Sequence, residues 1–160
     1  MGPVTRDTNG SGTSPAVVLV HGAFAESASW NGVLSRLRAR GLDASAIANP
    51  LRSLAGDAAY VRDVVASLGR PVVLVGHSYG GMVITEAAAG DAAVVGLVYV
   101  SAFVPATGQS ALGLSNSEPG STLGDALASY PLAAGGNEFA IRPDASRPSS
   151  PGMCPRPRRV

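Results

Sequence analysis

The chain has 160 residues, of which 46% are hydrophobic and 14% charged, and its formal net charge is +1 at pH 7. This composition predicts a globular domain that buries a sizeable core, and the balanced charge excludes the clustered imbalance typical of nucleic-acid and membrane-surface proteins. The chain has no lysine, which excludes a lysine Schiff base and a P-loop, and its one cysteine cannot form an internal disulfide.

Residues 1–15 are rich in Gly, Ser and Thr, which predicts a flexible leader. They hold no apolar run of signal-peptide length, and no stretch of the chain approaches the ~20 apolar residues that span a bilayer. We therefore expect a cytoplasmic protein with neither a membrane nor a nucleic-acid partner. The folded domain begins with residues 16–20, a continuous apolar run rich in β-branched residues, which is typical of a strand buried on both faces of a parallel sheet.

Helix and strand patterns alternate along the next part of the chain. Apolar residues recur at helical spacing in residues 30–37 and 61–68, and each of these segments is followed by a glycine. Further strands are predicted over residues 42–47, 71–75 and 94–100, and a third helix over residues 79–89. Strict β-α alternation predicts the α/β class, with a doubly wound parallel sheet that carries helices on both faces.

The motif Gly-x-Ser-x-Gly follows the third predicted strand, with Ser78 at its centre. In a glycine-rich chain this match alone is weak, so its context decides. A buried strand before the motif and a helix directly after it form the sharp turn that lifts a serine hydroxyl above the sheet, where it can act as a nucleophile. The flanking glycines remove Cβ clashes in such a turn. The context therefore favours Ser78 as a nucleophile over a plain glycine-rich turn.

A second motif, His21-Gly22-Ala23-Phe24, follows the first strand. Loops at the carboxyl ends of neighbouring parallel strands face one crevice, so the two motifs meet if the first and third strands pair. Acyl transfer needs two backbone N–H donors near the attacked carbonyl group. Ala23 and Tyr79 would supply those two donors.

Residues 18–24, the pair Ser29-Trp30 and residues 76–81 together resemble the α/β-hydrolase superfamily. The nearest branch contains small esterases similar to plant methyl esterases and hydroxynitrile lyases, and the likeness covers residues 16–105 well and extends loosely to 144. The resemblance implies a serine hydrolase that cleaves small carboxylic esters without a cofactor or metal. It implies Ser78 as the catalytic residue, Ala23 and Tyr79 as the oxyanion hole, and Phe24 and His77 as substrate-pocket residues.

The pattern departs from the superfamily in its missing triad partners, because the general base there is a histidine that comes late in the chain. The only histidines are His21 and His77, and we expect both to hold their loops in shape. The late carboxylates Asp125, Glu138 and Asp144 are interpreted as solvated surface groups. We therefore expect an apparently truncated hydrolase that lacks the triad acid and base, so the activity of this chain is left open.

The domain organisation follows from the same comparison. We expect an incomplete hydrolase domain over residues 16–141 that includes the start of a cap, with a short helix over residues 123–130. Residues 142–160 are rich in Arg and Pro, which predicts an irregular tail. With one choice of codons, the coding sequence from residue 145 reads in another frame as a sequence that looks like the cap of the family. The tail is therefore interpreted as an out-of-frame end. Without further strands, the apolar fourth strand would form an exposed edge that promotes self-association or poor solubility.

Two alternatives to the esterase remain open. One is a hydroxynitrile-lyase-like enzyme, which the absence of lysine weakly disfavours. The other is a non-catalytic small-molecule binder or inactive fragment that uses the surviving pocket.

Overall fold

The computed structural model describes residues 14–106, 109–110, 113–114, 120, 122–133 and 135–145. The chain divides into two compact units, Met1–Ser115 and Asn116–Val160. The predicted leader, residues 1–15, and the predicted tail, residues 142–160, lie almost entirely outside the described residues.

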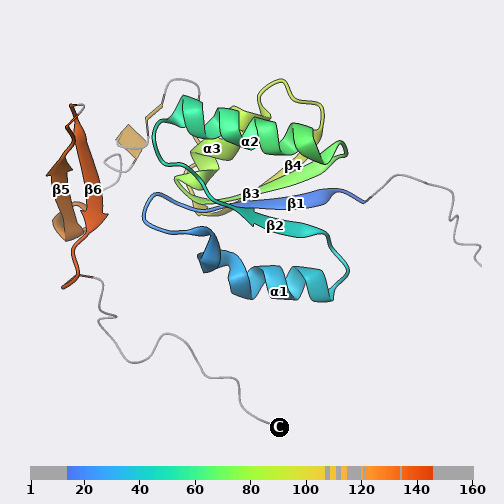
Figure 1. The fold of residues 1–160 in the computed structure, drawn as a ribbon, viewed down its shortest axis with the longest axis horizontal. Coiled ribbons are helices and arrows are strands. Elements are labelled where there is room, and N and C mark those ends of the chain that lie inside the picture. The colour runs from blue at the N-terminus through green and yellow to red at the C-terminus, as the bar shows by residue number, and fades with distance from the viewer. Residues whose placement is uncertain are drawn as a thin grey trace, which may run out of the picture. The chain divides into compact units, whose positions relative to one another are not determined.

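The first unit is built on a four-stranded parallel sheet with the strand order β2-β1-β3-β4 (Figure 1). The order makes β1 and β3 neighbours, and Val20 at the end of β1 pairs with Gly76 of β3. The loops that leave these two strands therefore start side by side. The strands are β1 (Ala16–Val20), β2 (Ala44–Ile47), β3 (Val72–Ser78) and β4 (Val94–Ala102).

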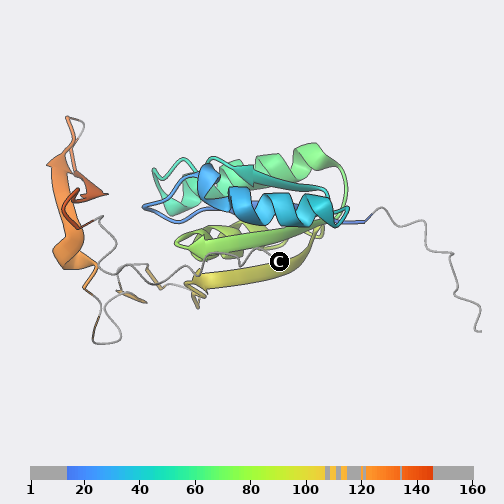
Figure 2. The same cartoon turned by 90° about the horizontal axis from the view of Figure 1, so that it is seen from below.

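Helices cover both faces of this sheet, α1 on one face and α2 with α3 on the other (Figures 1 and 2). The predicted doubly wound α/β architecture is therefore confirmed. A 3-10 turn, η1, leads directly into α1. The helical elements are η1 (Ser27–Trp30), α1 (Asn31–Ala39), α2 (Leu54–Leu68) and α3 (Gly80–Ala88).

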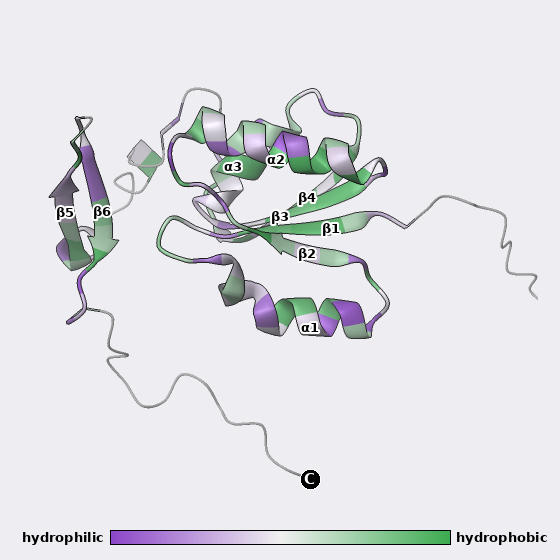
Figure 3. Cartoon of the chain, in the orientation of Figure 1, coloured by the Kyte–Doolittle hydropathy of each residue, from purple (hydrophilic) through white to green (hydrophobic). Residues whose placement is uncertain are grey.

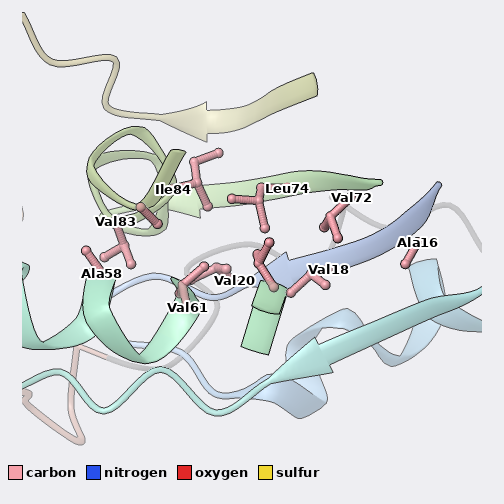
Figure 4. Packing of buried hydrophobic residues seen from close by; sticks show 11 residues of the cluster. Ala16, Val18, Val20, Ala58, Val61, Val72, Leu74, Val83 and Ile84 are labelled. Carbon is pink, nitrogen blue, oxygen red and sulfur yellow. The ribbon is translucent and has the colours of Figure 1, made fainter. Parts of the chain in front are cut away.

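Two apolar clusters hold the layers together. The larger lies between the sheet and the α2–α3 layer and includes Val18, Leu74 and Ile84, all fully or almost fully buried (Figure 4). The smaller lies on the α1 face around Leu19, Trp30 and Val75. The inner strands β1 and β3 are apolar along most of their length, whereas polar residues interrupt α1 (Figure 3). This pattern follows from burial, because β1 and β3 are covered on both faces while α1 has one face in solvent.

Helix α2 begins seven residues earlier than the apolar spacing predicts. Ser53 is its N-cap, and the Ser53 Oγ accepts a 3.1 Å hydrogen bond from the Gly56 N–H. At the other end, Gly69 adopts a left-handed conformation with φ 59°, which ends the helix. The early start matters for the site, because it places the first turn of α2 beside the carboxyl edge of the sheet.

The second unit corrects one prediction. Instead of a helix over residues 123–130, its described residues form a 3-10 turn, η2 (Gly124–Ala126), followed by a hairpin of β5 (Leu127–Pro131) and β6 (Asn137–Ile141). The hairpin turn contains Gly135 and Gly136 with positive φ angles. An isolated helix of this length is only marginally stable, whereas the paired strand supplies hydrogen bonds that local spacing cannot reveal.

Two further features of the described residues bear on function. None of their helices combines the length and the apolar character that crossing a lipid bilayer requires. In the first unit β4 pairs only with β3, and its side chains Val98 and Val100 are 45% and 40% exposed. They alternate with Leu97 and Tyr99, which pack against the larger cluster.

Candidate active site

Ser78 ends β3 in a strained turn. Its φ angle is 53°, in the left-handed region that non-glycine residues rarely adopt. The glycines around it permit the turn, since a β-carbon on Gly76 would lie 2.6 Å from the Gly80 carbonyl oxygen. A β-carbon on Gly80 would lie 2.5 Å from the Val20 carbonyl oxygen. Only glycine fits at these two positions, and the chain passes directly from Ser78 into α3, the geometry that exposes a serine at the end of a strand.

The loop after β1 touches this turn. A β-carbon placed on Gly22 would lie 2.8 Å from the Ser78 Cβ and 3.2 Å from His77 Nδ1. The absence of a side chain at Gly22 therefore lets the two loops approach closely. The predicted contact between the two motifs is present, and it results from the pairing of β1 with β3.

A buried carboxylate supports the residue after Ser78. Asp57, in the first turn of α2, is fully buried, and its Oδ2 accepts a 2.9 Å hydrogen bond from the Tyr79 hydroxyl group. Its Oδ1 accepts a 3.1 Å hydrogen bond from the Arg52 N–H. Burial raises the pKa of the Tyr79 phenol well above its usual range, and the hydrogen bond to Asp57 and its negative charge raise it further. Tyr79 therefore stays a neutral hydrogen-bond donor in the folded protein.

His21 joins the first-strand loop to the loop after β2. The residue is 4% exposed, and its Nε2 accepts a 3.0 Å hydrogen bond from the Asn49 N–H. Its Nδ1 lies 2.9 Å from the Gly22 carbonyl oxygen, which can only accept, so the proton resides on Nδ1. Both ring nitrogens are thus engaged with backbone groups, which matches the expectation that His21 holds its loop in shape.

The side chain of His77 lies on the α1 face of β3. Its ring meets the indole of Trp30 edge to face, with centroids 6.3 Å apart and an interplanar angle of 89°. Trp30 belongs to the smaller cluster on the α1 face, together with Val75, which is two residues before His77 on β3. Because strand side chains alternate, His77 points to the α1 face, away from the α2–α3 face.

A small cavity lies next to the turn and holds about 170 Å³. Ala23 and Tyr79, the two predicted oxyanion-hole residues, both line it. Phe24 and His77, the predicted substrate-pocket residues, are not among its lining residues, and Phe24 is 43% exposed. The remaining lining residues come from the loop between β2 and α2, namely Leu51, Arg52 and Ser53.

Sequence reasoning missed the contribution of this loop and of Asp57. A signal for Asp57 was present, because it lies four and eight residues before Val61 and Val65 and so shares the buried face of α2. A carboxylate on an apolar helix face requires a polar partner, and Tyr79 supplies it. No comparable pattern singles out Leu51, whose φ angle of 58° is a tertiary property.

The late carboxylates Asp125, Glu138 and Asp144 are exposed, as the surface interpretation expects. Asp144 lies 3.7 Å from Arg142, which is half-exposed. Within the part of the chain that the structure describes, no three His, Cys, Asp or Glu side chains lie close enough together to hold a metal ion.

The chain matches known proteins over most of its described length. A model of the alpha/beta hydrolase family matches residues 17–159. The alpha/beta hydrolase nvfD of Aspergillus novofumigatus is 34% identical over 118 residues, which are 62% of this chain and 47% of that protein. The carbendazim hydrolyzing esterase of a Nocardioides species is 35% identical over 113 residues, which are 61% and 46% of the two chains. This chain therefore spans about half the length of these relatives.

A solved structure shows the same fold. The monoacylglycerol lipase of Paleococcus ferrophilus superimposes with a TM-score of 0.51 at 26% identity. The superposition covers 57% of this chain and 41% of the lipase. A parallel sheet with helices on both faces is thus shared with a known hydrolase fold.

Proposed function

The chain belongs to the alpha/beta hydrolase family, and on that premise we propose that it carries the nucleophile half of a serine hydrolase acting on small carboxylic esters. The observation that carries this proposal is the contact of Gly22 with Ser78, which brings the loop after β1 against a strained serine turn. The esterase name of the Nocardioides relative supports an ester substrate.

In the proposed reaction, the Ser78 Oγ gives up its proton to solvent water, attacks the ester carbonyl carbon and forms a tetrahedral intermediate. The N–H groups of Ala23 and Tyr79 donate hydrogen bonds to the oxyanion, and each such donor contributes about 3–4 kcal/mol in measured enzymes. The carbon–oxygen bond to the leaving group then breaks, the alkoxide takes up a proton, and an acyl group remains on Ser78. Water hydrolyses this acyl-enzyme in a second step.

The proton acceptor for Ser78 is the incomplete part of this mechanism. Both nitrogens of His21 are engaged with backbone groups, and His77 points to the α1 face. We therefore propose that neither histidine serves as the general base. Hydrolases that lack triad members keep a residual acceleration of about 10³–10⁴-fold from binding and the oxyanion hole, so we expect slow turnover.

The test is hydrolysis of a short-chain activated aryl ester, combined with fluorophosphonate labelling and mass spectrometry of the labelled peptide. Ser78→Ala should lose the covalent label, whereas turnover that rests on binding and the oxyanion hole alone persists. The matched control is Ser67→Ala, an exposed serine on α2 whose hydroxyl group donates only to its own helix. Covalent labelling that survives in Ser78→Ala would contradict the proposed nucleophile.

A second candidate is a non-catalytic small-molecule binder. The engagement of both His21 nitrogens favours it, because a binder needs the cavity but no general base. A binder is stabilised against thermal unfolding by ester or acid ligands without turnover, whereas an esterase releases product. Both signals together would favour the hydrolase.

A further inference from the structure

The loop between β2 and α2, residues 49–53, contributes residues 51–53 to the cavity that Ala23 and Tyr79 line, and it is fixed at its first end by buried polar groups. The Asn49 N–H donates to His21 Nε2, and the Asn49 Nδ2 donates a 3.3 Å hydrogen bond to the His21 carbonyl oxygen. Asn49 and His21 are 6% and 4% exposed. This end of the loop is therefore tied to the loop that carries Ala23.

The second end of the loop is fixed to the serine turn. The Arg52 N–H donates to Asp57, and the same carboxylate accepts the hydrogen bond of Tyr79, the residue directly after Ser78. Ser53 then caps α2. Two buried groups, His21 and Asp57, thus hold the loop against both halves of the proposed oxyanion hole.

Leu51 lies between these two fixed ends and is strained. Its φ angle of 58° falls in the left-handed region, which is unfavourable for a residue with a β-carbon. Such conformations persist only where the surroundings impose them, and they concentrate at functional sites. The hydrogen bonds at Asn49 and Arg52 supply that constraint, and Leu51 lines the cavity of about 170 Å³ next to Ala23 and Tyr79.

We propose that the 49–53 loop is the wall that limits the length of the substrate's carbon chain, with Leu51 as the specificity-determining residue. The cavity holds about 170 Å³ and is open to solvent. Methylene groups that extend beyond its wall therefore stay in water and add no binding free energy. The substrate class is therefore an ester with a short straight chain next to its carbonyl group. The assignment of this carbon chain to an ester substrate rests on the proposed function.

The test measures binding, so it does not depend on turnover. Acetate, butyrate, hexanoate and octanoate are titrated into the ¹⁵N-labelled chain as product-like probes, and amide shifts are followed by NMR. We expect butyrate to shift the amide signals of Ala23, Leu51 and Tyr79, and octanoate to bind no more tightly than butyrate. In Leu51→Ala the dissociation constant should fall about fourfold for each methylene that the enlarged cavity accepts.

The matched control is Leu42→Ala, an exposed leucine outside the cavity lining, which should keep the wild-type chain-length profile. An unchanged profile in Leu51→Ala, or no shift of the cavity amides with any probe, overturns the inference. If the protein selects among carboxylates by carbon-chain length but its Ser78 fails to react, the result supports the role of the loop. The same result contradicts the proposed hydrolysis.

A second variant tests the constraint on the loop itself. Leu51→Gly removes the β-carbon that strains the left-handed conformation, whereas Leu51→Ala keeps it. We expect Leu51→Gly to have the higher midpoint of thermal unfolding of the two. A lower midpoint for the glycine variant would show that the loop does not hold Leu51 in this conformation.

Discussion

The hydroxyl group of Tyr79 lies 2.9 Å from Oδ2 of Asp57, a fully buried carboxylate on a different helix. This hydrogen bond links the first turn of α2 to the residue directly after Ser78. Because Asp57 also accepts the Arg52 N–H, one side chain positions both the serine turn and the neighbouring loop. Asp57 is thus a positioning residue in the proposed site.

Asp57→Ala should lower the free energy of unfolding, because it leaves two part-buried donors, the Tyr79 hydroxyl group and the Arg52 N–H, without the carboxylate, at up to about 1–3 kcal/mol each. Asp57→Asn keeps one acceptor oxygen, so its free energy of unfolding should fall less than that of Asp57→Ala. Urea unfolding followed by circular dichroism measures both. Asp63→Ala, on the same helix but outside the buried face, is the control. Equal stability of Asp57→Ala and the wild type would show that the buried carboxylate contributes nothing.

The raised pKa of Tyr79 predicts a loss of stability at alkaline pH. Below about pH 10 the phenol is protonated in both the folded and unfolded chains. Above it the unfolded chain loses this proton while the folded chain keeps it, so stability falls as pH rises toward the folded pKa. Unfolding free energies across this range should fall less steeply in Tyr79→Phe. The chain has no lysine, so no ammonium side chain titrates in the same pH range.

Substitutions of Ser78 separate strain from chemistry. Ser78→Gly and Ser78→Ala both remove the hydroxyl group, but only Ser78→Ala retains a β-carbon at φ 53°. We expect Ser78→Gly to be about 1 kcal/mol more stable than Ser78→Ala in thermal unfolding, since left-handed backbone is unfavourable for residues with a β-carbon. If the alanine variant proves the more stable of the two, the turn is not strained in solution.

Gly22→Ala should disturb the site through contact alone. Its β-carbon would lie 2.8 Å from the Ser78 Cβ, so one of the two loops must move. This movement should lower the free energy of unfolding by about 1–3 kcal/mol. Gly32→Ala in α1 is the matched control, because its β-carbon meets only the flexible Arg36 side chain and helix propensity improves. Thermal unfolding and the amide spectrum of Tyr79 measure the effect. Identical spectra for Gly22→Ala and the wild type would contradict the contact.

The exposed side of β4 predicts self-association. Val98 and Val100 are half-exposed, and residues 92–117 contain no charged side chain that would prevent edge pairing. Light scattering after size-exclusion chromatography should show association that decreases in the double variant Val98→Lys/Val100→Lys. Val33→Lys adds charge at an exposed valine of α1 and should leave the association unchanged. A wild-type monomer at high concentration would rule out this interaction.

Local patterns were sufficient for the elements of the first unit. The apolar runs in β1 and β3 and the helical spacing in α1 and α2 result from burial of one or both faces, which each segment records by itself. The helix predicted over residues 123–130 failed because its backbone finds a partner strand ten residues later. The start of α2 was missed because its first turn depends on the Ser53 cap and the buried Asp57.

The sequence by itself determined the fold class, the likeness to hydrolases and the candidate nucleophile, because strands, glycine turns and Ser78 lie in short contiguous motifs. Only the tertiary structure decided how the site is supported. Asp57 meets Tyr79 across 22 residues and Asn49 meets His21 across 28, and the strained Leu51 lies between the groups that these contacts fix. Such contacts arise when parallel strands bring distant loops to one edge of a sheet, a step that local periodicity does not record.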